Sequence, residues 1–152
     1  MNRVFVDASV LFAATYSLTG NARDLVQLAL EGKVTLVVSP VVLGEVERNL
    51  SKKAPEKVEF YRLLIEVIPF ELAGDPTKEE LLEAAIYTKL KDAPIVAAAQ
   101  KARVEYLVTY DRKHLIDPPE VAEKSGLTIV TPDVVVRAIH ESENDPNGHD
   151  PN

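Results

Sequence analysis

The sequence predicts an α/β domain of three layers, in which helices cover both faces of a central parallel sheet. Four short apolar runs rich in β-branched residues indicate buried strands, at 3–6, 34–38, 105–109 and 126–130. Helical patterns fill the segments between these runs, as expected when crossover helices join parallel strands. A further run at 67–72 contains a proline and is therefore expected only as a short edge strand.

Helix-start signals support this arrangement. Ser39-Pro40 and Thr131-Pro132 each combine a capping hydroxyl with a proline, which the first helical turn tolerates. Asp92-Ala93-Pro94 gives the same signal with a carboxylate as the cap. Helices are expected, in order, from residue 10, at 22–30, from 40, at 56–67, at 78–89, from 93 and from 132. The helix at 78–89 is expected to bury four apolar side chains: Leu81, Leu82, Ala85 and Ile86.

Length and composition indicate one domain. The chain has 152 residues, of which 46% are hydrophobic and 27% charged. Residues 1–140 are expected to form the domain, and 141–152, which contain no apolar residue, a disordered acidic tail. The lack of cysteine, of a signal pattern and of a long apolar run favours a cytoplasmic protein without a membrane segment. The net charge of −7 argues weakly against non-specific nucleic-acid binding.

Four acidic residues lie at the boundaries of the predicted elements. They are Asp7 and Asp111 just past strands, Glu45 early in the helix after the second strand, and Asp92 at a helix start. Because the carboxyl ends of parallel strands meet at one edge of a sheet, we expect the four carboxylates to converge. Crowded carboxylates repel one another, and a hard divalent ion such as Mg²⁺ relieves that repulsion. Such an ion can activate water and neutralise charge on a phosphodiester.

Two hydroxyl side chains accompany these acids. Thr109 lies two residues before Asp111 and is expected to present its hydroxyl toward a metal-bound water or a phosphate. Ser9 lies two residues after Asp7, where it can do the same or hold Asp7 in orientation. The histidines show no metal-ligand spacing: His114, His140 and His149.

Each of these acids also has an ordinary structural role open to it. Asp7 and Asp92 are suited to cap helices, and Asp111 to cap the turn that follows it. Glu45 can pair with Arg48 on the surface of its helix. The chemical interpretation therefore depends on the four acids occurring together, in order, at element boundaries.

Four motifs in sequence resemble the PIN-domain family. They are Val4-Phe5-Val6-Asp7-Ala8-Ser9, Ser39-Pro40-Val41-Val42-Leu43-Gly44-Glu45, Lys91-Asp92-Ala93-Pro94-Ile95-Val96 and Leu107-Val108-Thr109-Tyr110-Asp111. The resemblance covers about residues 2–140 and implies a strand order of 3-2-1-4-5 with a ribonuclease site dependent on Mg²⁺ or Mn²⁺. The resemblance implies that the family's acidic positions correspond to Asp7, Glu45, Asp92 and Asp111, and that its Thr/Ser position corresponds to Thr109. Ser9 and Tyr110 depart from it, standing where many relatives have asparagine and glycine.

The resemblance also implies partners. Small single-domain members are mostly toxins of VapBC-like toxin–antitoxin pairs, usually homodimers that cut RNA and are held inactive by an antitoxin protein. Two alternatives keep the fold: a binding or regulatory module with an inactive site, and an RNA-processing nuclease without an antitoxin. A third is an Asp-centred phosphatase or phospho-acceptor domain, although Asp7-Ala8-Ser9 lacks the second aspartate that such phosphatases use.

Overall fold

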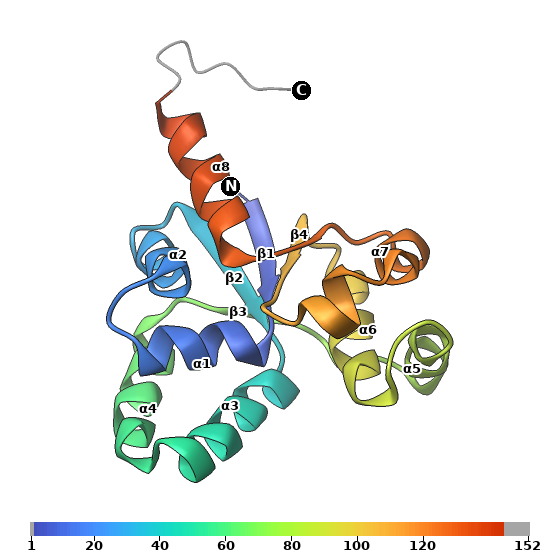
Figure 1. Cartoon of the computed structure of the whole chain (residues 1–152), viewed down its shortest axis with the longest axis horizontal. Coiled ribbons are helices and arrows are strands. Elements are labelled where there is room, and N and C mark those ends of the chain that lie inside the picture. Colours follow the sequence, from blue (N-terminus) through green and yellow to red (C-terminus); the bar gives the residue numbers. More distant parts are fainter. Residues whose placement is uncertain (1, 145–152) are drawn as a thin grey trace.

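Five parallel strands form a single sheet in the computed structural model, which describes residues 2–144. The strand order is β3-β2-β1-β4-β5, as the family resemblance predicts, and every neighbouring pair is parallel. The strands are β1 (Asn2–Val6), β2 (Val34–Val38), β3 (Glu71–Leu72), β4 (Tyr106–Val108) and β5 (Ile129–Val130). Figure 1 shows β1 in the middle of the sheet.

The central strand β1 is apolar because it is covered on both faces. Val4, Phe5 and Val6 are fully buried. The register places Phe5 between Val37 of β2 and Leu107 of β4, so the three strands end at nearly the same level. A continuous apolar run is what a strand needs when helices pack above and below it.

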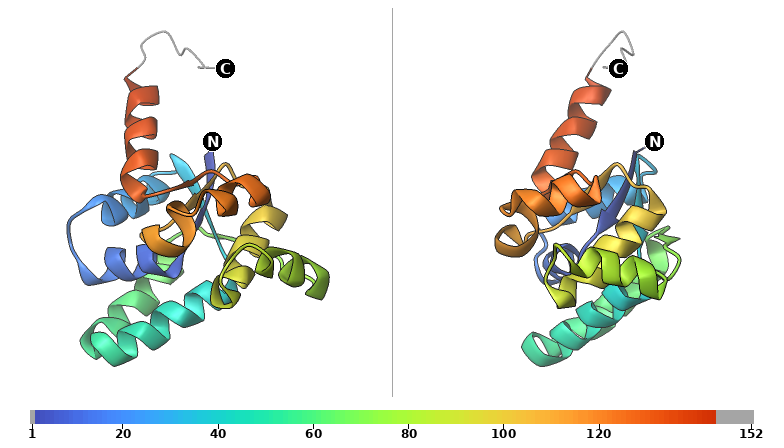
Figure 2. Two further views of the ribbon diagram at one scale, coloured as in Figure 1. Left: turned by 45° about the vertical axis from the view of Figure 1, so that its right-hand side comes forward. Right: turned by 90° about the vertical axis from the view of Figure 1, so that its right-hand side faces the viewer.

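Eight α-helices lie within the described residues and flank the sheet (Figure 2). They are α1 (Ala8–Tyr16), α2 (Asn21–Leu30), α3 (Pro40–Lys53), α4 (Val58–Val67), α5 (Lys78–Ala85), α6 (Ala93–Ala102), α7 (Pro119–Ser125) and α8 (Pro132–Glu143). Helix α1 packs against α2 and α3, α2 packs against α8, and α5 packs against α6. Two 3₁₀ turns, Pro55–Lys57 and Leu90–Asp92, and a π-helical turn, Arg112–Ile116, complete the chain. Within residues 2–144, no helix has the length and apolar character of a membrane span.

Ser39 caps α3 as its sequence context predicts. Its Oγ accepts a hydrogen bond from the backbone N–H of Val42 over 3.3 Å, and Pro40 occupies the first turn. Replacing Ser39 with alanine should lower the free energy of unfolding by about 0.5–1 kcal/mol, because that N–H loses its acceptor. Chemical denaturation measures the change. Ser142→Ala, at an exposed site in α8, is the control; an equal loss in both variants would contradict the assigned cap.

The helix predicted at 78–89 is shorter, and its buried face differs. Helix α5 ends at Ala85. Leu82 and Ile86, both predicted to be buried, are 70% and 78% exposed. Ala84 is fully buried instead, in a helix that packs against the alanine-rich α6. Small side chains allow two helices to approach closely, so this contact, rather than the larger apolar residues, sets the rotation of α5.

The last helix runs past the predicted end of the domain at residue 140. Helix α8 continues to Glu143, whose carboxylate forms an ion pair with Lys33 over 2.7 Å. Residues 141–143, predicted to belong to the disordered tail, are therefore helical. The rest of that predicted tail, residues 145–152, lies outside the described part of the chain.

Candidate metal centre

A cleft of about 320 Å³ opens where the central strands end. It is lined by all four acids singled out from the sequence: Asp7, Glu45, Asp92 and Asp111. We name it the acidic cleft. Its walls come from four separate parts of the chain, namely the end of β1, helix α3, the start of α6 and the turn after β4. The fold thus gathers these side chains at the carboxyl edge of the sheet.

Asp7 is held in one orientation at the end of β1. Its Oδ1 accepts a hydrogen bond from the N–H of Ala8 over 2.7 Å, which is the capping role open to it. Its Oδ2 accepts from the hydroxyls of Thr109 over 2.7 Å and Ser9 over 3.4 Å. The backbone N–H of Asp7 donates to Val108, which continues the β1–β4 pairing and sets Asp7 beside Thr109. Burial raises the pKa of Asp7, and the hydrogen bond from Thr109 opposes that rise.

Thr109 orients two of the acids. Its fully buried hydroxyl donates to Oδ2 of Asp7 and accepts a hydrogen bond from the N–H of Asp111 over 3.0 Å. This differs from the predicted orientation toward a metal-bound water or phosphate, because the hydroxyl is committed to the protein on both sides. The Ser9 hydroxyl accepts from the N–H of Tyr110 over 3.1 Å and also contacts Asp7, which is the orienting alternative predicted for it.

Asp92 precedes α6 without capping it. Its side chain accepts no hydrogen bond from the start of that helix, so the predicted capping role is wrong. The residue is 7% exposed, and within residues 2–144 its buried Oδ2 has no hydrogen-bond partner. Burial raises the pKa of Asp92 more than the charge of Lys91 lowers it, and the charges of Asp111 and Asp7 raise it further. A buried carboxylate oxygen without a partner is costly, and a cation would provide the partner.

Glu45 lies at the edge of the buried face of α3. Val42 and Val46 of the same helix are fully buried, and Glu45 is half-buried against the acidic cleft. The alternative surface ion pair with Arg48 is not formed, since no ion pair of Glu45 occurs in the described part of the chain. Burial raises the pKa of Glu45, and the nearby charge of Asp7 adds to that rise.

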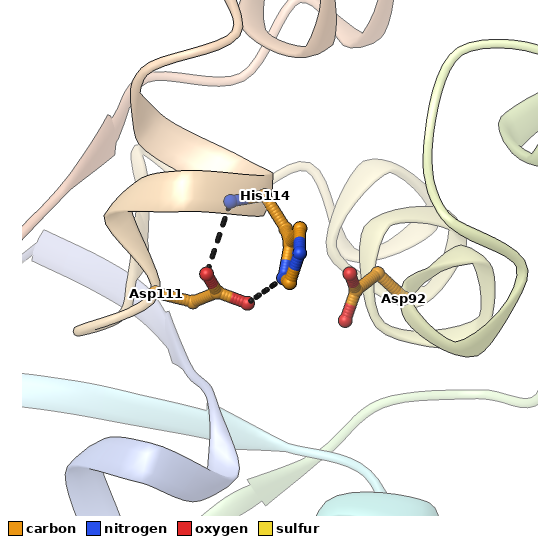
Figure 3. Close-up of side chains that lie close together, drawn as sticks. All are labelled: Asp92, Asp111 and His114. Carbon is orange, nitrogen blue, oxygen red and sulfur yellow. Dashed lines mark hydrogen bonds and ion pairs between the residues drawn. The ribbon is translucent and has the colours of Figure 1, made fainter.

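The ring of His114 joins the acids, which the sequence analysis did not predict, whereas the His114 N–H makes the capping contact that was open to Asp111. Oδ1 of Asp111 accepts from the N–H of His114 over 3.0 Å, and its Oδ2 lies 3.2 Å from Nδ1 of the ring. One possible ligand atom each from Asp92, Asp111 and His114 lie within 4.8 Å of one another. Figure 3 shows the three side chains pointing toward one another. The signal was the spacing Asp-x-x-His, because residues three apart on a helical turn share one face.

The donor set of the acidic cleft fits a divalent cation. Mg²⁺ and Mn²⁺ prefer carboxylate oxygens, which the four acids supply. Burial and mutual charge raise the pKa of Asp7, Glu45 and Asp92, so all three carboxylates are poorly compensated by the protein alone. The Oδ2 atom of Asp92, which has no hydrogen-bond partner within residues 2–144, shows the same lack of compensation. A bound cation would offset the negative charge of these carboxylates and give the Asp92 oxygen a partner.

The rim of the acidic cleft carries basic and aromatic side chains. Lys53, Lys91, Phe12 and Tyr110 all line it. The Nζ atom of Lys53 lies 5.7 Å from the centroid of the Phe12 ring. Lysines neutralise nucleic-acid phosphates, and aromatic rings stack on unpaired bases. The rim therefore has the chemistry to receive a single strand of nucleic acid beside the acids.

Sequence comparison decides the family. A model of the PIN domain matches residues 3–113, a segment that begins in β1 and contains all four acids of the cleft. The chain belongs to the PIN domain family. PIN domains are typically metal-dependent nucleases, which agrees with the acidic cleft and replaces the phosphatase hypothesis. No curated protein matches the sequence significantly.

Solved structures share the fold of this PIN domain at low sequence identity. PAE2754 from Pyrobaculum aerophilum has a TM-score of 0.64 at 20% identity, over 92% of this chain and 96% of that protein. VapBC2 from Rickettsia felis, bound to a DNA fragment from its promoter, has a TM-score of 0.57 at 16% identity, over 84% and 96%. FitAcB from Neisseria gonorrhoeae has a TM-score of 0.57 at 15% identity, over 85% and 97%. These likenesses show the fold.

Proposed function

We propose that this PIN domain is an endoribonuclease that uses Mg²⁺ or Mn²⁺ to hydrolyse phosphodiester bonds in RNA. The observation that carries the proposal is the meeting of four acids in one cleft, with a buried oxygen of Asp92 left without a partner. The lysines and the exposed ring of Tyr110 at the rim support an unpaired RNA segment as the substrate, because only unpaired bases are free to stack on that ring.

The side chains of the cleft divide between holding the ion and placing the RNA. The ligands in this proposal are the four acids, Asp7, Glu45, Asp92 and Asp111. When bound, the ion supplies an activated water and neutralises charge on the phosphodiester. Thr109 keeps the side chain of Asp7 and the backbone of Asp111 in fixed relation through its two hydrogen bonds. Lys53 and Lys91 attract the phosphate backbone toward the acids.

Cleavage of a panel of end-labelled RNAs tests this proposal. We expect products only with Mg²⁺ or Mn²⁺, no products in EDTA, and recovery when excess ion is returned. Unpaired substrates should be cut faster than duplexes of the same sequence. An Asp7→Asn protein purified in parallel excludes a contaminating ribonuclease. RNA binding without cleavage under all of these conditions would support the inactive binding module instead.

We further propose that the chain is the toxin of a type II toxin–antitoxin pair, acting in the cytoplasm as a homodimer under the control of an antitoxin protein. The resemblance to VapBC-like toxins and the fold likeness to VapBC2 and FitAcB support this role. Induced expression should arrest growth, and a small protein encoded beside the gene should relieve the arrest. Normal growth together with RNA cleavage in vitro would favour an RNA-processing nuclease without an antitoxin.

A further inference from the structure

We propose that His114 is a metal ligand, and that its nitrogen makes the acidic cleft select a transition-metal ion such as Mn²⁺ over Mg²⁺. The inference rests on the proposed metal-dependent function and adds to it a residue outside the set of four acids. It concerns the cluster of Asp92, Asp111 and His114, in which the two acids line the acidic cleft and His114 lies beside it.

The geometry places an imidazole nitrogen near both carboxylates. The three possible ligand atoms already lie within 4.8 Å of one another. Ligands about 2.0–2.3 Å from one ion lie within about 4.6 Å of each other, so a small side-chain rotation suffices. Nδ1 of His114 faces Oδ2 of Asp111, and a ring that donates from Nδ1 keeps its lone pair on Nε2.

A second observation concerns a side-chain oxygen of Asp92, a residue of the same cluster. This residue is more than nine-tenths buried, and its Oδ2 finds no donor in residues 2–144. The nearby ring of His114 leaves that oxygen without a hydrogen bond, although it does contact Asp111. An ion shared by the carboxylate and the imidazole satisfies both groups at once.

The choice of ion follows from the mixed ligand set. Mg²⁺ takes oxygen ligands and gives up its waters reluctantly, whereas first-row transition metals, among which Mn²⁺ binds such sites most weakly, also accept imidazole. A histidine that only oriented Asp111 would change the affinity for both ions to a similar degree, since such outer contacts act through the carboxylate. A histidine that binds the ion changes the affinity for Mn²⁺ alone.

Calorimetric titration of the metal-free protein separates these two roles. The wild type should bind Mn²⁺ at least about 10-fold more tightly than Mg²⁺. His114→Ala and His114→Gln should each remove most of that preference while leaving Mg²⁺ affinity within about twofold. His140→Ala, at an exposed position in α8, is the matched control and should retain the preference. An equal loss for both ions, or an unchanged ratio in both His114 variants, would overturn the proposal.

Pulsed electron paramagnetic resonance of the Mn²⁺ complex provides a readout that does not depend on RNA. The wild type and His140→Ala should show a nitrogen coupling to the ion that is absent in His114→Gln. Nitrogen coupling without RNA cleavage would support the ligand while ending the proposed nuclease function. Metal-dependent RNA cleavage without nitrogen coupling would support the nuclease function and exclude His114 as a ligand. If neither ion binds, both proposals fail.

Discussion

Replacing Asp7 with asparagine should reduce the rate of RNA cleavage at least about 100-fold while preserving the fold. The amide has nearly the shape of the carboxylate, so it still accepts one hydrogen bond at the end of β1. It lacks the negative charge that a cation requires, and its NH₂ group cannot accept the bond that Thr109 now donates to Oδ2. Initial rates at saturating Mn²⁺ measure the loss, and circular dichroism checks the fold.

The matched control for this variant is Asp75→Asn, which makes the same chemical change at an exposed loop position before α5. Its cleavage rate should remain within about twofold of the wild type, because surface substitutions away from a buried or functional site usually have small effects. Retention of cleavage by Asp7→Asn would remove Asp7 from the proposed ligand set. A similar loss in both variants would point to a general effect of charge on RNA binding.

Asp92→Asn should have opposite effects on stability without and with metal. In EDTA near pH 8 the variant should be more stable than the wild type by about 1–3 kcal/mol, because it removes the charge from a buried side chain whose Oδ2 has no partner within residues 2–144. Addition of Mn²⁺ should stabilise the wild type by mass action and leave the variant nearly unchanged. Thermal or chemical unfolding measures both effects.

The pH dependence of the free energy of unfolding tests independently whether Asp92→Asn stabilises the metal-free protein. Burial raises the pKa of Asp92 in the folded protein, so the folded state binds the proton more tightly than the unfolded chain. The wild type therefore loses stability as pH rises through the folded pKa, and the cost is absent below the unfolded value. The gain in the free energy of unfolding from Asp92→Asn should be largest near pH 8 and should vanish toward pH 4. Asp24→Asn, exposed on α2, should show no such trend; a gain independent of pH would contradict the assignment.

The parts of the fold that could be predicted from the sequence are those governed by local chemistry and by burial on both faces. β1 and β2 each contain an apolar run that is typical of a covered parallel strand. Ser39-Pro40 marks the start of α3 because a cap and a first-turn proline act within four residues. The convergence of the four acids followed from the meeting of strand ends, and the acidic cleft contains all of them.

The features that could not be predicted depend on contacts between distant elements. The rotation of α5 is set by the close approach of α6, which no periodicity within residues 78–89 reveals. Thr109 turns its hydroxyl to Asp7, a neighbour 102 positions away in sequence. His114 was accessible in principle, because its spacing from Asp111 is local. The spacing of the histidines from one another carries no such signal.

The acidic cleft is assembled from segments that leave the ribosome at very different times. Asp7 is synthesised well before Asp111 and His114, which follow β4. A growing polypeptide therefore lacks the complete set of ligands until translation has passed this point. For a nuclease made on the very class of polymer that it is proposed to cut, this order delays cleavage until the last of these ligands has been synthesised.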